Sequence, residues 1–246
     1  MTHILNPDNS LNNWLKEQQF PAFRSKQIRR WLYQGRAGSF DDMSDLPKKL
    51  RDQIESDFTI WTSRVAEHQT SKDGTEKLLL ELSDGGRIEC VLLREDKRRT
   101  ICISSQVGCA MGCVFCASGL DGVDRNLTSG EIIEQMLQLQ RLLPMEERLS
   151  HIVVMGMGEP LANLDRLLPA LDQASANDGL GISARRITIS TVGLPEAINR
   201  LANLNSRYHL AVSLHAPNDQ LRDQIVPVNS NIGIEKILTA ADHYFD

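Results

Sequence analysis

The spacing of apolar residues follows a helical period over the first part of the chain and then changes. Residues 1–60 repeat apolar side chains at helical intervals, with Ile28 and Leu32 on one face of a charged segment. This pattern predicts a small helical N-terminal domain. In residues 61–99 two apolar stretches flank a Ser-Asp-Gly-Gly turn at 83–86, which predicts a β-hairpin that links this domain to the rest of the chain.

From residue 100 onward, apolar strand-like stretches alternate with amphipathic helical ones. Such alternation predicts βαβ units and a parallel sheet, so the predicted fold class is α/β. The strands are nearly continuous apolar runs, as expected where both faces of a sheet are covered. The predicted strands are 100–104, 151–155, 186–190 and 208–213, and the predicted helices are 129–143, 161–175, 195–204 and 232–245.

The last predicted helix reaches residue 246 without the glycine or proline that usually ends a helix. Only four βα units fit into 100–246, whereas a closed eight-unit barrel takes about 250 residues. The fourth strand would then be an open edge. We expect that the sequence stops before the fold does, and a partner chain that completes the sheet is the alternative.

Composition and charge narrow the class of protein. Of the 246 residues, 41% are hydrophobic and 24% are charged, which is typical of a soluble globular chain. The net charge of −5 excludes a basic coat over the whole chain, although Lys and Arg gather at 24–36 and 94–99. These basic segments are either solvated faces or RNA contacts. The sequence contains no secretory leader or membrane-spanning stretch, so we expect a cytoplasmic location and no membrane association.

The cysteines provide the first candidate chemistry. Four of the five lie between Cys102 and Cys116, closer together than in the disulfide framework of a secreted protein. Cys109, Cys113 and Cys116 follow a predicted strand with the spacing C-x3-C-x2-C. Three thiolates are one short of a closed zinc site or a fully ligated iron–sulfur cluster. A [4Fe–4S] cluster held this way keeps one iron open for catalysis, and a structural zinc site with Cys102 as fourth ligand is the alternative.

A second candidate segment lies at the carboxyl end of the strand at 151–155. There the chain reads Gly-Met-Gly-Glu-Pro over 156–160. Two glycines allow a ligand to approach the backbone closely, and Glu159 can accept hydrogen bonds from an ammonium group. A plain glycine turn before a helix is the alternative. A dinucleotide-binding fingerprint is excluded because its third glycine position is occupied by Leu161.

Together these two segments resemble the radical S-adenosylmethionine (SAM) superfamily. In that superfamily three cysteines hold a [4Fe–4S] cluster, and a Gly-Gly-Glu-Pro-like segment holds the amino group of SAM. The resemblance implies a partial (βα) barrel of the radical SAM type, here without its last two strands. The chain is also similar to the RlmN/Cfr group of RNA methyltransferases, and the matching segments are 23–33, 46–48, 102–109, 125–128, 156–160, 189–193 and 213–217.

The resemblance implies radical chemistry on RNA. Members of this group methylate C2 or C8 of adenine, and such electron-poor ring carbons are weak nucleophiles. One SAM molecule methylates a cysteine, and a second is cleaved at the open iron to give the radical that activates this methyl group. We expect C2 methylation of an adenine in 23S rRNA, with tRNA as a second substrate in some members. The enzyme is expected to be a monomer that takes electrons from a donor such as flavodoxin or ferredoxin.

The resemblance also implies the site residues, position by position. Cys109, Cys113 and Cys116 correspond to the cluster ligands. Cys102 corresponds to the cysteine that resolves a covalent protein–RNA adduct, and Glu89 to the proton acceptor. The helical N-terminal domain and the basic segment 24–36 are the candidate RNA contacts. The positions that correspond to SAM contacts are Gly158, Glu159, Ser190, Ser213, Leu214 and His215.

One position departs from the family pattern. The methyl-carrying cysteine of the group lies near the C-terminus, and no cysteine follows Cys116 here. Cys90, in the predicted hairpin, is a poor substitute. Two alternatives to the methyltransferase therefore stay open. One is a shortened chain that binds the cluster and SAM without methylating RNA, and the other is a zinc-stabilised RNA-binding module.

Overall fold

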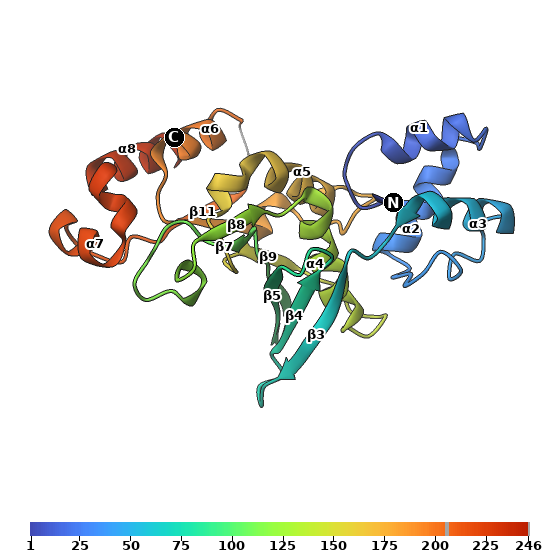
Figure 1. Ribbon diagram of the computed structural model, residues 1–246, viewed down its shortest axis with the longest axis horizontal. Coiled ribbons are helices and arrows are strands. Elements are labelled where there is room, and N and C mark those ends of the chain that lie inside the picture. Colours follow the sequence, from blue (N-terminus) through green and yellow to red (C-terminus); the bar gives the residue numbers. More distant parts are fainter. Residues whose placement is uncertain (205–206, 246) are drawn as a thin grey trace.

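The computed structural model describes residues 1–204 and 207–245. Its N-terminal part is helical, as the apolar spacing predicts, and Figure 1 shows it at the right-hand end of the molecule. Ile28, Leu50 and Ile54 are fully buried and form the centre of its apolar packing. The elements are α1 (Ser10–Glu17), α2 (Phe23–Tyr33) and α3 (Lys48–Asp57), together with the short parallel pair β1 (Thr2–His3) and β2 (Phe58–Thr59).

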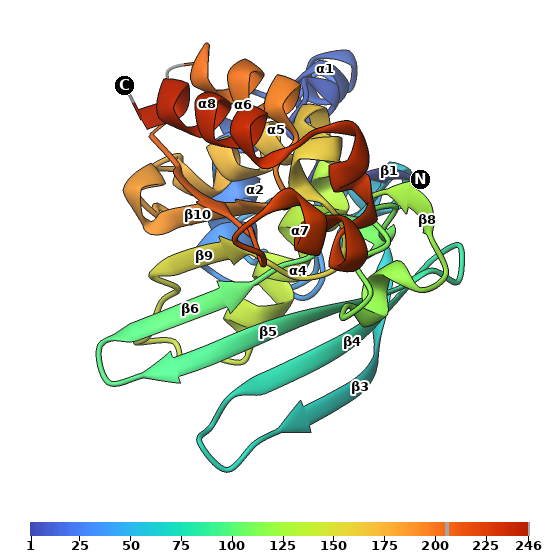
Figure 2. The ribbon, with the colours of Figure 1, turned by 90° about the vertical axis from the view of Figure 1, so that its left-hand side faces the viewer.

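A seven-stranded mixed sheet forms the centre of the molecule, in the order β11-β10-β9-β6-β5-β4-β3. Neighbouring strands from β3 to β6 are antiparallel, and β6, β9, β10 and β11 are parallel (Figure 2). The predicted hairpin is therefore part of a larger antiparallel meander that continues into the parallel strands. The strands are β3 (Ser63–Thr70), β4 (Glu76–Leu82), β5 (Arg87–Glu95), β6 (Arg98–Cys102), β9 (His151–Val154), β10 (Ile187–Thr191) and β11 (His209–Val212).

The two faces of the parallel strands are covered differently. Ile101, Ile152 and Ile187 are register partners on one face, and all three are completely buried. On the other face the register partners Cys102 and Val153 are only half-buried. The expectation that both faces are covered is thus wrong for the described residues, because the short apolar runs alternate between a helix-covered face and a more open one.

Helices cover the buried face of the sheet (Figure 2). The first begins with a capping box, in which Thr128 and Glu131 bond each other's backbone N–H groups. Within the described residues, no helix is both long enough and apolar enough to span a bilayer. The helices are α4 (Ser129–Arg141), α5 (Leu164–Ser175), α6 (Pro195–Ala202) and α8 (Ile234–Phe245), while α7 (Asp219–Ile225) lies nearer the carboxyl ends of the strands.

Short elements carry the remaining loops. A small antiparallel hairpin of β7 (Gln106–Gly108) and β8 (Val123–Asn126) holds the segment 109–122 as its connecting loop. Because this loop contains Cys109, Cys113 and Cys116, we call it the cysteine loop. The 3-10 helices are η1 (Ala117–Gly119), η2 (Pro160–Asn163), η3 (Ala184–Arg186) and η4 (Pro227–Asn231).

Candidate cofactor site

A cavity of about 300 Å³ opens at the carboxyl ends of β9, β10 and β11. In sheets of parallel strands this end is where ligands bind. The cysteine loop forms one wall, and the residues that follow the three strands form the other. The predicted site residues that line the cavity are Cys109, Cys113, Cys116, Gly158, Glu159, Ser190, Ser213 and His215.

The three thiols of the cysteine loop lie close enough to influence one another. Burial raises the pKa of Cys113 above its ordinary value, and the neighbouring Cys109 and Cys116 raise this pKa further. Burial likewise raises the pKa of Cys109, with Glu159 and Cys116 adding to the rise. Thiolates crowded in this way repel one another, and a positively charged metal group bound to them would stabilise their ionised forms.

The cysteine loop is fixed at both sides of the cavity. At its base the backbone N–H of Cys109 donates to the carbonyl of Gly122 at 2.7 Å. In its middle the N–H of Val114 donates to the carbonyl of Ile225, at the end of α7, at 3.1 Å. Gly112, with φ of +66°, supplies the left-handed turn between the first two cysteines.

A single zinc ion and a four-iron cluster require different arrangements of the thiols. Zinc requires all its ligands within about 2.3 Å. Among the described residues, no three Cys, His, Asp or Glu side chains are close enough together to hold one ion. In a four-iron cube each thiolate binds its own iron, so ligands around a cavity suit a cube better. Cys102, the fourth ligand of the zinc alternative, does not line the cavity.

Glu159 connects two strand ends beneath the cavity. Its carboxylate is only 3% exposed; Oε1 accepts from the N–H of Leu161 at 3.0 Å and Oε2 from that of Val192 at 2.9 Å. Burial raises the pKa of Glu159, against the effect of these hydrogen bonds. Each carboxylate oxygen can accept one further bond. Glu159 therefore joins the ends of β9 and β10, and its carboxylate can still accept hydrogen bonds from a ligand.

The two glycines before Glu159 are required by the protein's own packing. A Cβ on Gly156 would lie 2.6 Å from Ser104 Oγ, and one on Gly158 would lie 2.6 Å from Gln106 Cβ. Gly158 also has φ of +95°, which disfavours other residues. The sequence interpretation attributed these glycines to the approach of a ligand. In the structure it is the protein's own segment after β6, with Ser104 and Gln106, that lies against these glycines.

The remaining predicted SAM contacts come from β10 and β11. Ser190 Oγ and Ser213 Oγ lie 3.1 Å apart and join the two strand ends. His215 has φ of +63°, unusual for a residue with a side chain, and its ring packs on Phe115 at 4.6 Å between centroids. Leu214 does not line the cavity.

Glu89 and Cys102 lie outside the cavity but share one face of the sheet. Cys102 is the register partner of Val91, which is two residues from Glu89 on β5, so all three side chains point the same way. Glu89 accepts a hydrogen bond from Lys77 Nζ at 2.9 Å. Burial raises the pKa of Cys102. Cys90 points to the opposite, buried face, and burial raises its pKa strongly.

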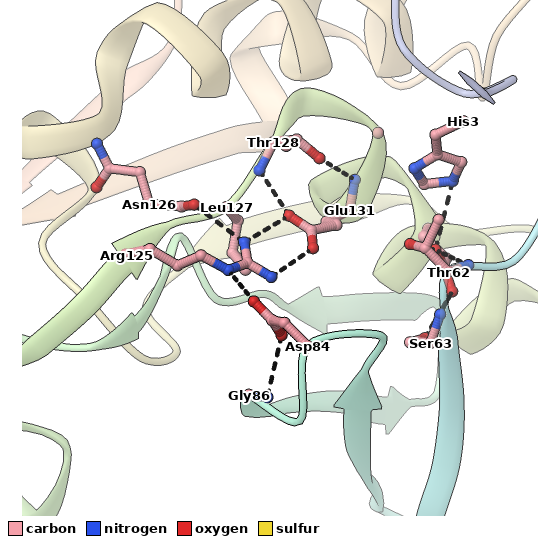
Figure 3. A network of polar contacts seen from close by, with 12 residues as sticks. His3, Thr62, Ser63, Asp84, Gly86, Arg125, Asn126, Leu127, Thr128 and Glu131 are labelled. Atoms are coloured by element: carbon pink, nitrogen blue, oxygen red, sulfur yellow. Dashed lines mark hydrogen bonds and ion pairs between the residues drawn. The ribbon is translucent and has the colours of Figure 1, made fainter. Parts of the chain in front are cut away.

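Arg125 fixes the base of the cysteine loop, although the sequence suggested no role for it. Its guanidinium binds both carboxylate oxygens of Glu131 at 2.8–2.9 Å and Asp84 at 2.5 Å (Figure 3). Asp84 in turn accepts from the N–H of Gly86. One side chain thus joins β8, the start of α4 and the turn between β4 and β5.

A second polar network joins the start of β3 to α4 and brings His3 of the N-terminal part against the same carboxylate (Figure 3). The carboxylate of Glu134 is 1% exposed and accepts four hydrogen bonds, from the backbone N–H and the hydroxyl of both Thr62 and Ser63. His3 lies 3.4 Å away. Burial lowers the pKa of His3, against the pull of Glu134.

The basic segment 24–36 is largely engaged within the protein. Arg29 contacts Gln173 at 2.9 Å and Asp178 at 3.5 Å. Arg30 pairs with Asp45 at 2.6 Å, and Arg36 donates to backbone carbonyls at 143–147. These three arginines therefore have clear structural roles, which weakens the interpretation of the segment as an RNA contact.

Two family models match the chain. The model described as "Ribosomal RNA large subunit methyltransferase N-terminal domain" matches residues 4–60, and the model of the radical SAM superfamily matches residues 103–246. A solved structure of a radical SAM methyltransferase from Sphaerobacter thermophilus is similar, with a TM-score of 0.93 and 38% identity. The match covers 99% of this chain and 72% of that one.

Curated relatives carry a more specific name. A "Probable dual-specificity RNA methyltransferase RlmN" from Rhodopirellula baltica is 66% identical over 99% of this chain and 66% of its own length. The protein of the same name from Bacillus pumilus is 44% identical over 95% of this chain and 65% of its own length. The chain thus spans slightly less than two thirds of the length of these relatives.

Proposed function

The chain belongs to the RlmN family within the radical SAM superfamily, and from this premise we propose that it serves RNA (adenine-C2) methylation. The name of its relatives, dual-specificity RNA methyltransferase, supports RNA as the substrate. We take the two specificities to be 23S rRNA and tRNA. Membership of the superfamily implies a [4Fe–4S] cluster and SAM as cofactors.

One observation carries the proposal: the three cysteines and five of the six predicted SAM contacts line the same cavity. They come from segments more than 100 residues apart in the sequence, between Cys109 and His215. When bound there, the cluster supplies an electron and an open iron that binds the sulfonium donor. Cys109, Cys113 and Cys116 hold it, while the strand ends around Glu159 and Ser213 orient SAM against it.

Glu89 and Cys102 are the proposed catalytic pair. They lie on one face of the sheet, beside the end of β6 that leads into the cavity wall. In the proposed scheme Glu89 accepts a proton from the methylated adenine adduct. The thiolate of Cys102 then attacks the sulfur of the methyl-carrying cysteine, so that an S–S bond forms, the S–C bond to the adduct breaks and the released carbon takes up a proton. Lys77, paired with Glu89, holds that carboxylate in place.

None of the five cysteines corresponds to the methyl-carrying position of the family. The contribution proposed for this chain is therefore binding of the cluster, SAM and RNA, with methyl transfer dependent on that further cysteine. The same proposal divides the chain into an accessory part (1–60), a linking part (61–99) and a radical SAM core (100–246). It includes a cytoplasmic location and a one-electron donor of the flavodoxin or ferredoxin type.

Anaerobic reconstitution with iron and sulfide tests the proposal. About four irons and four sulfides per chain, and release of 5′-deoxyadenosine from SAM under reductant, are the expected results. Methylated adenine in added 23S rRNA would show that the chain is sufficient by itself. Release of 5′-deoxyadenosine without methylation would favour the second alternative, a chain that binds and cleaves SAM only. Stoichiometric zinc without labile sulfide would contradict the proposal.

A further inference from the structure

A buried arginine lies beside the cysteine loop and is not explained by the proposed reaction. Arg222, on α7, is completely buried, and no other arginine or lysine among the described residues is. Taking a charged group out of water is costly unless an opposite charge compensates it. No carboxylate in the described part of the chain lies within ion-pair distance of Arg222, and only Asp219 and Asp223 act on its charge from farther away.

All three hydrogen-bond partners of Arg222 are neutral. Its Nε donates to the carbonyl of Leu214 at 3.0 Å, one terminal nitrogen donates to the carbonyl of Val192, and the other donates to the Asn229 side chain. Asp219 and Asp223 make no hydrogen bond to the guanidinium; Asn229 stands between, and its amide donates to both carboxylates at 2.7–2.9 Å.

Two of these contacts hold the walls of the cofactor cavity. Val192 lines the cavity after β10, and Leu214 lies between the lining residues Ser213 and His215 after β11. The planar guanidinium thus joins the segment after β10 to the segment after β11. This placement explains why Leu214, predicted as a SAM contact, does not line the cavity: its carbonyl is directed to Arg222.

The cysteine loop packs against the same helix. Val114, the residue after Cys113, donates its N–H to the carbonyl of Ile225, one turn beyond Arg222. A Cβ on Gly112 would lie 3.9 Å from Pro227, directly after α7. The residues on both sides of Cys113 thus lie against the end of α7, the helix that carries Arg222, or against the residues directly after it.

We propose that the buried charge of Arg222 is balanced in part by the iron–sulfur cluster on Cys113 and makes that cluster easier to reduce. A cluster with three thiolates carries net negative charge, and this charge grows by one unit when an electron from the external donor enters it. A fixed positive charge in a low-dielectric interior stabilises the reduced form more than the oxidised form. Arg222 is therefore a positioning residue that also adjusts the reduction potential. The inference rests on the proposed function, because it requires the cluster.

The test compares two substitutions in the reconstituted chain. Arg222→Gln removes the charge but keeps amide donors for the carbonyls, whereas Arg222→Lys keeps the charge and loses the planar fork. The reduced fraction of the cluster is measured by electron paramagnetic resonance at a series of fixed potentials. For Arg222→Gln we expect at least a tenfold lower ratio of reduced to oxidised cluster, which corresponds to a fall of about 59 mV for one electron. Arg222→Lys is expected to stay within about threefold of the wild type.

A matched control is Arg200→Gln, which removes an exposed arginine that pairs with Asp165 away from the cavity. This control is expected to leave the ratio unchanged. A folded Arg222→Gln chain with a full cluster and the wild-type ratio would overturn the inference. If glutamine prevents folding, the lysine variant decides: the wild-type ratio supports the inference, and a loss of tenfold or more overturns it. A wild-type chain that takes up no cluster would contradict the proposed function instead.

Discussion

Glu134 and Glu159 are both buried carboxylates, but the regions around them differ. Glu134, on α4, accepts four hydrogen bonds from Thr62 and Ser63 and lies near His3. Around Glu159, three thiols line the same cavity, and burial raises the pKa of two of them as well as that of the carboxyl group. The carboxylate of Glu134 is surrounded by the chain's own donors, whereas Glu159 accepts two backbone N–H groups and, with the three thiols, keeps binding capacity for a ligand. Burial alone therefore does not identify a functional site; the absence of internal compensation does.

The largest expected effect is the loss of the cluster when a ligand in the cysteine loop, near Glu159, is substituted. Cys113→Ala should reduce the iron content of the reconstituted chain from about four per chain to nearly none, because two thiolates do not retain a cube. Iron and sulfide analysis after gel filtration measures this loss. The control is Cys90→Ala, on the opposite face of the sheet, which should keep its iron. A full cluster in the Cys113 variant would remove the central assignment.

The next largest effect concerns the hydrogen bonds of Glu134, which join α4 to the start of β3. Glu134→Gln replaces an acceptor oxygen by an NH2 group that faces backbone and hydroxyl donors, so we expect a loss of about 2–4 kcal/mol in the free energy of unfolding. Urea denaturation measures it, with the exposed Glu146→Gln as control. The iron content of both variants should match the wild type. An unchanged urea midpoint for the Glu134 variant would mean that this network does not stabilise the contact between α4 and the start of β3.

A smaller effect concerns the protonation of Glu159 and its contribution to stability. Burial raises the pKa of this carboxyl group in the folded chain, so the folded state binds its proton more tightly than the unfolded state does. Stability from this group is therefore present below the unfolded pKa of about 4.3 and is lost as the pH rises through the folded value. Glu159→Gln should remove that loss. The measurement is the free energy of unfolding of the cluster-free chain between pH 4 and pH 8, and parallel pH profiles for variant and wild type would contradict the prediction.

The smallest effect concerns the basic segment of α2. Arg30 is paired with Asp45, and an exposed pair contributes about 0–1 kcal/mol to stability. Lys26 is exposed on the same helix. If α2 contacts RNA, Lys26→Glu should lower the salt dependence of RNA binding by about one phosphate contact, whereas Arg30→Glu should change it less. Filter binding across a series of salt concentrations measures both slopes, and equal changes would show that the internal pairing does not matter.

Local and contiguous features of the sequence predicted much of this protein. The helical period of the first sixty residues and the strand–helix alternation after residue 100 both recur in the structure. The cysteine motif and the Gly-Met-Gly-Glu-Pro segment identified two walls of one cavity. These predictions succeed because helix caps, turns and ligand motifs depend on residues within a few positions of one another.

Only the tertiary structure decided how the sheet is covered and which charges are compensated. The hairpin extends into a meander because β6 pairs with β5 on one side and with β9 on the other. Glu134 meets its donors across about seventy residues, and Arg222 meets Val192 across thirty. The energy of a buried charge depends on which distant groups surround it, and no local pattern along the chain contains that information.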